Sequence, residues 1–439
     1  MILKALKKPL ILIKLILLTA TIVIEHPGAG SASAQGACPA TVGNTQWRAV
    51  NRSLMMALRS NASFTRAWFK ENVSKFFARE FVELEAYVIG DIHLNNLAPK
   101  LISIGGTSRK RSEMTVIDFD DAHFGKALAD LFYLSVITRS GTQDISAREI
   151  AQSYLDGLNG KPLDTSQLDH QLQAALKLTP QEIERLNEKY TEGHISTKRN
   201  KVRLNHKKLD TKKISKSSKE VQDVFPILET SFKRVLAERG YQVIDWGYTS
   251  KEEGGSMGLH RFFALAQKEG QLKIFQFKEL ESIEGQSAYE RVAHAMSIFW
   301  NLPFRKNNST PLEDHHEVIS TEVGTYLMAV KEKRLYRYEN KATGSLFPTF
   351  QAGTHYIAQV AGQYLGQQSA GLQLKRILES KSDKQEQFLE SVDAMVNAYI
   401  VPTTQIHNQA VAQLKRNREE VHKAQTKNKK KKKRKKKDK

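Results

Sequence analysis

Short apolar runs that end in polar clusters are the most regular pattern in the first third of the chain. Ala86–Ile89 and Met114–Ile117 are two such runs, and their length and composition predict buried strands. The longer apolar stretch Ala127–Ile137 predicts a helix, and Thr45–Glu85 repeats apolar residues at helical spacing. Residues 102–113, which separate the two predicted strands, are rich in glycine and arginine and favour a hairpin turn.

The second half of the chain changes to strand-like patterning. The predicted strands are Tyr241–Trp246, His260–Ala266, Leu272–Phe277 and a further one within Glu322–Lys331. A Glu269-Gly270 turn joins the second strand to the third, and Ser287–Trp300 has the pattern of an amphipathic helix.

Helical patterns fill most of the remaining chain, and together with the strands they predict an α+β fold. Helices are predicted within Ser146–Tyr190, with breaks at Pro162 and Pro180. Another is predicted at Phe225–Arg239, with Pro226 in its first turn. The last three are predicted at His355–Gly366, Phe388–Ile400 and Thr404–Lys423. The expected organisation is a signal at 1–34, a helical region at 35–197, a basic linker at 198–222, a β-rich lobe at 223–345, closing helices at 346–425 and a tail at 426–439.

The net charge of +20 is unevenly distributed. Lys427–Lys439 holds eleven Lys or Arg and one Asp, which is about half of the excess (11 − 1 = 10). Such a block predicts a disordered, solvated tail that is able to contact anionic lipid or nucleic acid. No aromatic residue interleaves with these lysines, which disfavours a specific nucleic-acid site. Cys38 is the only cysteine, so an intrachain disulfide and a cysteine-based zinc site are excluded.

The first 34 residues have the pattern of an export signal. A lysine-rich start precedes the apolar run Leu15–Ile24, which is too short to span a bilayer. Ala32-Ser33-Ala34 is a small-residue cleavage site before Gln35. We therefore expect an exported protein, periplasmic or secreted, and an uncleaved amphipathic anchor is the alternative.

The candidate chemistry lies at the ends of the first two predicted strands. Behind the first come Asp91, His93 and Asn96, and behind the second come Asp118, Asp120 and Asp121. Carboxylates that leave buried strands are unfavourable unless they are paired or bind a cation. Oxygen ligands of this kind suit Mg²⁺, which is held by one or two carboxylates and by substrate phosphates. The alternative is that these aspartates cap turns or helices.

A glycine-rich stretch followed by a lysine forms the second candidate cluster. Gly254, Gly255, Ser256 and Gly258 lie between two predicted strands, and Lys278 ends the next strand but one. Glycines allow backbone N–H groups to approach phosphate oxygens closely, and a lysine on the third strand is placed to hold the α- and β-phosphates of a nucleotide. A plain hairpin turn is the alternative.

Lys278 needs a carboxylate partner in this interpretation. Glu290, on the helix that follows the strands, is the expected partner, Glu279 is its rival, and ordinary surface exposure is the alternative for both.

The spacing of the acidic motifs resembles known catalytic loops. G-D-x-H-x-x-N at Gly90–Asn96, followed by I-D-F-D, resembles the loops of aminoglycoside phosphotransferases and, more distantly, of protein kinases. The resemblance implies that Asp91 is the catalytic base and that Asn96 and Asp118 are metal ligands, with Asp120 in support. It also implies that Asp130 is a buried structural aspartate.

The order of the motifs is permuted relative to kinases, because Gly90–Asp121 comes before Gly254–Lys278. This order is similar to that of the bacterial domain of unknown function 2252 family. The resemblance spans about residues 60–410 and implies a protein-kinase-like bilobal fold with permuted connectivity. Glu253 replaces a glycine of that family's pattern, and Tyr364–Ala370 lacks the pattern's histidine and arginine.

The expected function is Mg²⁺-dependent transfer of the γ-phosphate of ATP to an unidentified hydroxyl acceptor. The alternative is a non-catalytic, kinase-like binding protein of the cell envelope, which the export signal and Glu253 favour. Two weaker hypotheses remain: a nucleic-acid binder based on the tail and the basic linker, and a metal-dependent hydrolase that uses His93, Asp118 and Asp120. The sequence leaves the acceptor and the oligomeric state open.

Overall fold

The computed structural model describes residues 53–59, 62–93, 95–103, 110–163, 165–198, 201–250, 259–300, 316–336 and 350–437. Two compact units divide the chain: Arg52–Val401, and a second unit made of Met1–Asn51 with Pro402–Lys439. The expected export signal at 1–34 and the glycine stretch at 254–258 lie outside the described residues. Within the described ranges, none of the helices combines the length and the apolar character that a membrane crossing requires.

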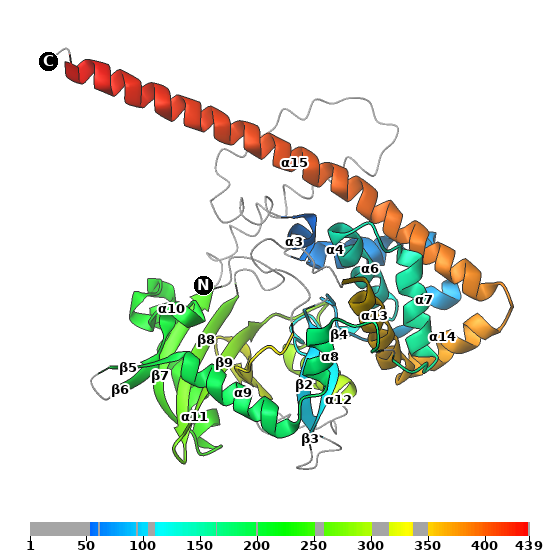
Figure 1. Cartoon of the computed structure of the whole chain (residues 1–439), viewed down its shortest axis with the longest axis horizontal. Helices are drawn as coiled ribbons and strands as arrows, with labels where there is room; N and C mark the ends of the chain where they lie inside the picture. Colours follow the sequence, from blue (N-terminus) through cyan, green and yellow to red (C-terminus); the bar gives the residue numbers. More distant parts are fainter. Residues whose placement is uncertain are drawn as a thin grey trace. The chain divides into compact units, whose positions relative to one another are not determined.

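One part of the Arg52–Val401 unit is helical, and its helices share a single apolar core (Figure 1). The helices of this part are α3 (Leu54–Arg59), α4 (Ala62–Asn72), α5 (Arg79–Val82), α6 (Ala129–Gly141), α7 (Ala147–Leu158), α13 (Phe350–Gly366), α14 (Ser369–Glu379) and the start of α15 (Lys384–Lys437). Glycine allows α7 and α13 to approach closely, because a Cβ at Gly362 would lie 1.9 Å from the carbonyl oxygen of Tyr154.

Two small antiparallel strand pairs carry the acidic motifs. β1 (Glu85–Val88) pairs with β4 (His123–Lys126), and β2 (Leu97–Ser103) pairs with β3 (Lys110–Val116). The strand predicted at 86–89 is therefore confirmed to within a residue, and the one predicted at 114–117 is the second half of β3, which begins four residues earlier at Lys110. β2 was not predicted, because Pro99 and Lys100 interrupt its apolar pattern, and its pairing with β3 compensates.

A five-stranded antiparallel sheet forms the other part of the unit, in the order β10-β11-β9-β8-β7 (Figure 1). Its strands are β7 (Gln242–Ser250), β8 (His260–Lys268), β9 (Gln271–Leu280), β10 (His316–Thr321) and β11 (Gly324–Val330). Glu269 and Gly270 both have positive φ values, 51° and 82°, as the tight hairpin turn between β8 and β9 requires. Since every pair of this sheet is antiparallel and most of the described helices belong to the other part of the unit, the fold is α+β.

The two faces of this sheet differ because side chains alternate along each strand. One face, which we call the helix face, carries Phe262, Phe275, Phe277 and Met328 and is covered by α11 (Lys219–Ala237). On the opposite face, Phe263, Leu265 and Ile274 pack against Leu204 of β6. α12 (Ala288–Phe299) connects β9 to the last two strands and packs into the core of the helical part.

The segment predicted as a basic linker, 198–222, is folded. β5 (Ile195–Lys198) pairs with β6 (Lys201–Leu204), followed by α10 (His206–Leu209), the short helix η3 (Ile214–Lys216) and the first turn of α11. The physical reason is that sparse apolar residues among the lysines, Val202, Leu204 and Leu209, pack on the sheet while the lysines stay exposed.

Three other expectations differ from the structure. α11 starts at Lys219, capped by Ser218, so Pro226 lies inside the helix rather than in its first turn. α15 continues through Pro402, so the helices predicted separately at Phe388–Ile400 and Thr404–Lys423 are one helix. The tail predicted as disordered is helical to Lys437. Lysine has a high helix propensity, and extending a helix that is already nucleated adds one hydrogen bond for each residue fixed.

Among the described residues, the remaining helices of the large unit are the short helix η2 (Val73–Lys75), α8 (His170–Leu176) and α9 (Pro180–Gly193). Pro180 was expected as a break, and it occupies the first turn of α9 behind the cap Thr179.

Candidate functional site

Lys278 of β9 meets the acidic segment that lies 160 residues earlier in the chain. Its Nζ lies 2.7 Å from Oδ1 of Asp118 and also forms an ion pair with Asp120. Lys278 and Asp120 are buried, whereas the side chain of Asp118 is 32% exposed. The two distant motifs singled out in the sequence thus share one site, with Asp118 on its solvent side.

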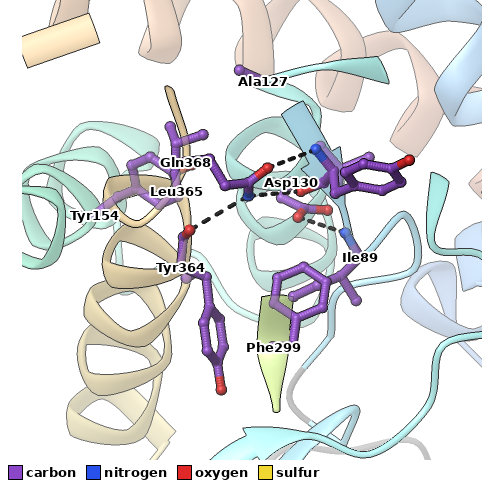
Figure 2. Close-up of a pocket in the computed structure, with 11 residues that line it drawn as sticks. Ile89, Ala127, Asp130, Tyr154, Phe299, Tyr364, Leu365 and Gln368 are labelled. Carbon is purple, nitrogen blue, oxygen red and sulfur yellow. Dashed lines mark hydrogen bonds between the residues drawn. The ribbon is translucent and has the colours of Figure 1, made fainter. Parts of the chain in front are cut away.

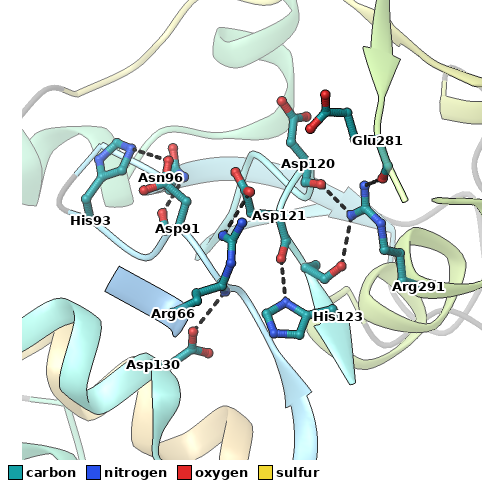
Figure 3. Close-up of polar contacts among 12 residues, drawn as sticks. Arg66, Asp91, His93, Asn96, Asp120, Asp121, His123, Asp130, Glu281 and Arg291 are labelled. Atoms are coloured by element: carbon teal, nitrogen blue, oxygen red, sulfur yellow. Dashed lines mark hydrogen bonds and ion pairs between the residues drawn. The ribbon is translucent and has the colours of Figure 1, made fainter. Parts of the chain in front are cut away.

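A buried arginine holds the backbone of this acidic segment in place (Figure 3). Arg291 of α12 is 1% exposed and donates hydrogen bonds to the carbonyl oxygens of Asp120 and Ala122, the latter at 2.9 Å. It also donates to the carbonyl oxygen of Glu281 at 2.5 Å, just past the end of β9. Burial lowers the pKa of Arg291 to about 10, and the charge of Asp121 opposes that shift. Arg291 therefore ties the acidic segment to the strand that carries Lys278.

The loop after β1 is fixed by the side chain of Asn96. Its Nδ2 donates to the carbonyl oxygen of Asp91 at 2.7 Å, and its backbone N–H donates to that of His93 at 2.8 Å. The carbonyl oxygen of Asn96 accepts a bond of 2.9 Å from the N–H of Ile117, which precedes Asp118. The side-chain nitrogen of Asn96 donates within the loop, and the side-chain oxygen Oδ1 is the acceptor atom suited to a cation.

Asp130 of α6 anchors the start of the same loop, as the sequence resemblance implied. Its Oδ2 accepts from the N–H of Ile89 at 2.7 Å (Figure 2). Its Oδ1 accepts from the N–H of Gly90 at 3.0 Å. Burial raises the pKa of Asp130 to about 6, which these two hydrogen bonds oppose. Gly90 has φ +80°, and a Cβ there would lie 2.1 Å from the carbonyl oxygen of Asp121. Glycine is thus required where the two acidic loops touch.

Gln368, at the N-terminal end of α14, supports β1 from behind (Figure 2). Its Oε1 accepts from the N–H of Tyr87 at 2.8 Å, and its Nε2 donates to the carbonyl oxygen of Tyr87 at 3.1 Å. A cavity of about 10 Å³ between Gln368, Tyr87 and Asp130 has room for one water molecule and for no larger ligand. Gln368 therefore holds the edge of β1.

Asp91 is buried in an unusual electrostatic setting. It is 8% exposed, and its Oδ1 makes no hydrogen bond to any residue that the structure describes. Burial raises the pKa of Asp91 to about 7, the negative charge of Asp121 adds to the shift, and Arg59 opposes it. A carboxyl group that titrates near neutrality is suited to general acid–base chemistry.

His93 acts on the loop around Asp91. Its Nδ1 accepts from the N–H of Asn95 at 3.1 Å, and its Nε2 lies 3.0 Å from a nitrogen of Arg59 and 3.8 Å from Oδ2 of Asp91. Through these contacts His93 fixes the loop by hydrogen bonding.

The oxygen atoms of this site fit a hard cation. Oδ1 of Asp120 is buried without a hydrogen-bond partner among the described residues, and buried carboxylate oxygens of this kind call for a cation or a donor. Within the described ranges, no three or more His, Cys, Asp or Glu side chains gather as a metal-binding group. Asn96, Asp118 and Asp120 would thus hold Mg²⁺ only together with phosphate oxygens, as is usual for that ion. The trio His93, Asp118 and Asp120 of the hydrolase hypothesis does not form such a group.

The expected ion pair between Lys278 and Glu290 is not among those of the described residues. Glu290 is exposed in the first turn of α12, and Oε2 of the rival Glu279 accepts from the N–H of His260 at 2.8 Å. Lys278 pairs with Asp118 and Asp120 instead. The reason is the orientation of α12, which turns Arg291 inward and leaves Glu290 in solvent.

Sequence reasoning missed Arg291. The available signal was an arginine inside the apolar stripe of Ser287–Trp300, where a charged residue is unexpected unless it is fully hydrogen-bonded. The glycine stretch Gly254, Gly255, Ser256 and Gly258 lies outside the described residues, so its expected role as a phosphate cradle stays a prediction.

Comparison with protein families, with curated proteins and with solved structures finds no match to this chain.

Proposed function

We propose that this protein is a kinase-like phosphotransferase with a permuted, bilobal arrangement, in which the sheet forms one lobe and the helices form the other. The reaction is Mg²⁺-dependent transfer of the γ-phosphate of a nucleoside triphosphate, such as ATP, to a hydroxyl group. The meeting of Lys278 with Asp118 and Asp120 supports the proposal most, because a phosphate-binding lysine and metal-binding carboxylates must share one site.

Asp91 is the proposed general base. It accepts the proton of the acceptor hydroxyl while the acceptor oxygen forms a bond to the γ-phosphorus and the bond from that phosphorus to the β–γ bridging oxygen breaks. The nucleoside diphosphate leaves with the electron pair of the broken bond. The pKa of Asp91, about 7, keeps a large fraction of the group ionised at neutral pH and able to take the proton.

The other residues hold the reactants. Lys278 and the stretch Gly254–Gly258 would bind the nucleotide phosphates, and Asn96, Asp118 and Asp120 would hold Mg²⁺. The ion would supply charge neutralisation at the phosphate oxygens. Arg291 and Asp130 contribute by positioning the two loops, since catalysis of phosphoryl transfer depends mainly on geometry and charge.

A second candidate is a kinase-like binding protein of the cell envelope that holds the nucleotide without transferring phosphate. Glu253 favours it, because an acidic side chain beside the glycine stretch repels nucleotide phosphates. Export of the chain, which we propose from its first 34 residues, favours it as well.

Thermal unfolding with Mg²⁺ and ATP tests the proposal. A ligand that binds the native state raises the midpoint, so we expect a Mg²⁺-dependent rise for the wild type and none for Asp118→Ala. Asp223→Ala, at an exposed position of α11, is the matched control and should keep the rise. An equal rise in Asp118→Ala would contradict the metal assignment, and no rise in the wild type would contradict nucleotide binding.

Asp91→Asn separates the two candidate functions. If the protein is a transferase, the Asp91→Asn variant should no longer cleave the γ-phosphate from ATP. It should still show the rise in unfolding midpoint with Mg²⁺ and ATP. If the wild type binds nucleotide and never turns it over at any Mg²⁺ concentration, the envelope binding protein is the better assignment.

A further inference from the structure

The last turns of α15 carry the densest run of charge in the chain. Residues 402–437 of this helix are the part of the second unit that the structure describes. The final stretch, Lys427–Lys437, consists of nine Lys, one Arg and Asn428, and we call it the basic block. At a rise of about 1.5 Å per residue, it places its ten positive charges along about 16 Å of helix axis, roughly twice the density of an extended chain.

The preceding stretch of the same helix has acidic residues among its basic ones. Glu419 lies four positions from Lys415 and four positions from Lys423. Glu420 lies four positions from Arg416. Positions three and four apart are neighbours on an α-helix, and opposite charges at this spacing stabilise it. This stretch therefore supplies part of its own counter-charge.

The basic block has no such arrangement. Each of its cations has another cation three or four positions away, and none of its residues is acidic. Glu420 lies seven positions before it, and Asp438, the residue after it, adds one negative charge against ten positive. Like charges at neighbouring helical positions destabilise a helix, which opposes the high helix propensity of lysine. An external anion that neutralises the basic block would therefore stabilise its helix.

The composition of the basic block indicates which kind of anion fits it. The block contains no aromatic residue to stack on bases and no apolar residue to enter a bilayer. Nine of its ten cations are lysines, which are compact, strongly hydrated charges, whereas recognition of single phosphates and of nucleic acid favours arginine.

A flat surface can attract such a helix by charge alone. A helix is about 10 Å across, and the Debye length is about 8 Å at physiological ionic strength. Helix positions on the near side and on the flanks therefore remain within the range of an anionic surface. These properties favour a membrane surface of anionic lipids over a nucleic acid.

We propose that the basic block is a peripheral docking helix for an anionic membrane surface, bound by charge and without insertion into the bilayer. Its ligand is the phosphate headgroup of anionic lipids. Each lysine near such a surface strengthens binding about fivefold, and docking stabilises the helix by relieving the repulsion among its own charges. The proposal goes beyond the phosphotransferase reaction and uses none of the residues assigned to it.

Sedimentation of the full chain with lipid vesicles tests this docking helix. We expect binding to phosphatidylcholine vesicles that contain about one-third phosphatidylglycerol, and at least tenfold weaker binding to phosphatidylcholine alone. Raising the salt concentration from about 0.1 M to about 1 M shortens the Debye length from about 10 Å to about 3 Å and should abolish the binding. Hydrogen exchange at the backbone amides of Lys427–Lys437 should become slower with the anionic vesicles and stay unchanged with the neutral ones.

Two variants that remove the same charge from different places locate the binding. The block variant combines Lys431→Gln, Lys432→Gln, Lys433→Gln, Arg434→Gln and Lys435→Gln. Glutamine has a helix propensity close to that of lysine, so this variant removes charge and keeps the helix. The control variant changes five exposed lysines of the segment 198–222, and it combines Lys201→Gln, Lys207→Gln, Lys212→Gln, Lys213→Gln and Lys216→Gln. Binding to anionic vesicles should weaken by at least about 100-fold in the block variant and by less than about fivefold in the control.

Three vesicle results would overturn the proposal: equal binding to neutral and anionic vesicles, no binding to either, or the same loss of affinity in the block and control variants. A DNA duplex of arbitrary sequence tests the other class of partner. If the duplex binds more tightly than the anionic vesicles at the same salt concentration, and the block variant loses that binding, the basic block is a nucleic-acid site instead. The rise in unfolding midpoint with Mg²⁺ and ATP should be the same in the wild type and in both variants, so the outcome for docking is separate from that for phosphate transfer.

Discussion

The two faces of the five-stranded sheet share one backbone and differ in chemistry around Lys278. On the helix face, Phe232 of α11 stacks on Phe277 with ring centroids 4.0 Å apart, and both rings are completely buried. On the opposite face, the very next residue, Lys278, pairs with Asp118 and Asp120. One strand thus supplies alternately a core side chain and a site side chain.

This difference shows where stability and chemistry are separated in the molecule. Apolar burial on the helix face contributes to folding without direction, roughly in proportion to buried area. Burying the charges of Lys278 and of the acidic loops costs free energy of folding, and pairing and hydrogen bonding offset that cost. Changes on the helix face should therefore affect unfolding, and changes at the charged site should affect binding.

Phe232→Ala should have the largest effect on stability. Removing a fully buried aromatic ring destabilises a fold by about 3–5 kcal/mol, and urea denaturation would measure this loss. Ile227→Ala, at a 41% exposed position of the same helix, is the control and should change little. Mg²⁺ and ATP should still raise the unfolding midpoint of both variants. If folded Phe232→Ala showed no such rise, the helix face would also contribute to binding, which would contradict the separation.

Arg291→Met should affect both stability and binding, because Arg291 is buried and also hydrogen-bonded to the acidic segment. The carbonyl oxygens of Asp120, Ala122 and Glu281 lose their donor, which should lower the free energy of unfolding by about 3 kcal/mol. The nucleotide-dependent midpoint shift should fall as well, since the acidic segment loses its support. If the variant is destabilised but binds ATP with the affinity of the wild type, Arg291 contributes to stability alone and the predicted link to binding is wrong.

Asp130→Asn should have a smaller effect that depends on pH. Burial raises the pKa of Asp130 from 3.8 to about 6 in the folded protein. Between these values the folded state binds more protons than the unfolded state, so the contribution of this group to stability is full below pH 3.8 and is lost as pH rises through 6.

The wild type should therefore lose on the order of 3 kcal/mol relative to Asp130→Asn between pH 4 and pH 7. At pH 4 the variant should be the less stable of the two, by about 1 kcal/mol, because its amide accepts only one of the two hydrogen bonds from the N–H groups of Ile89 and Gly90. Urea midpoints at the two pH values measure the difference, and parallel pH profiles would contradict it.

Glu290→Gln should have the smallest effect. The side chain is exposed and lies next to the residue that does hold the site, Arg291. We expect a change in unfolding free energy within about 0.5 kcal/mol and an unchanged Kd for ATP. A large loss of ATP affinity would restore the pairing of Glu290 with Lys278 that the sequence suggested.

Much of the site was predictable because its signals are local. The runs before Asp91 and Asp118, and the strand that carries Lys278, followed from apolar pattern alone. That these segments meet could be expected only by resemblance, since no local rule joins residues 160 positions apart. Arg291 and the order of the sheet depend on tertiary packing, which the sequence pattern does not encode directly.

The basic segment 198–222 shows a different limit. Its mean polarity indicated a linker, yet a few apolar residues at alternating positions were enough to fold it onto the sheet. Alternation was a better guide there than composition, because the buried Leu204 and the half-buried Val202 can order a short hairpin whose lysines remain in solvent.

Anomalous diffraction from crystals grown with Mn²⁺ and a non-hydrolysable ATP analogue tests the central claim most directly. We expect a Mn²⁺ peak at about 2.1 Å from a carboxylate oxygen of Asp118, with phosphate oxygens of the analogue beside Lys278. An analogue bound elsewhere, or a metal peak away from Asp118 while Lys278 keeps both carboxylates, would contradict it.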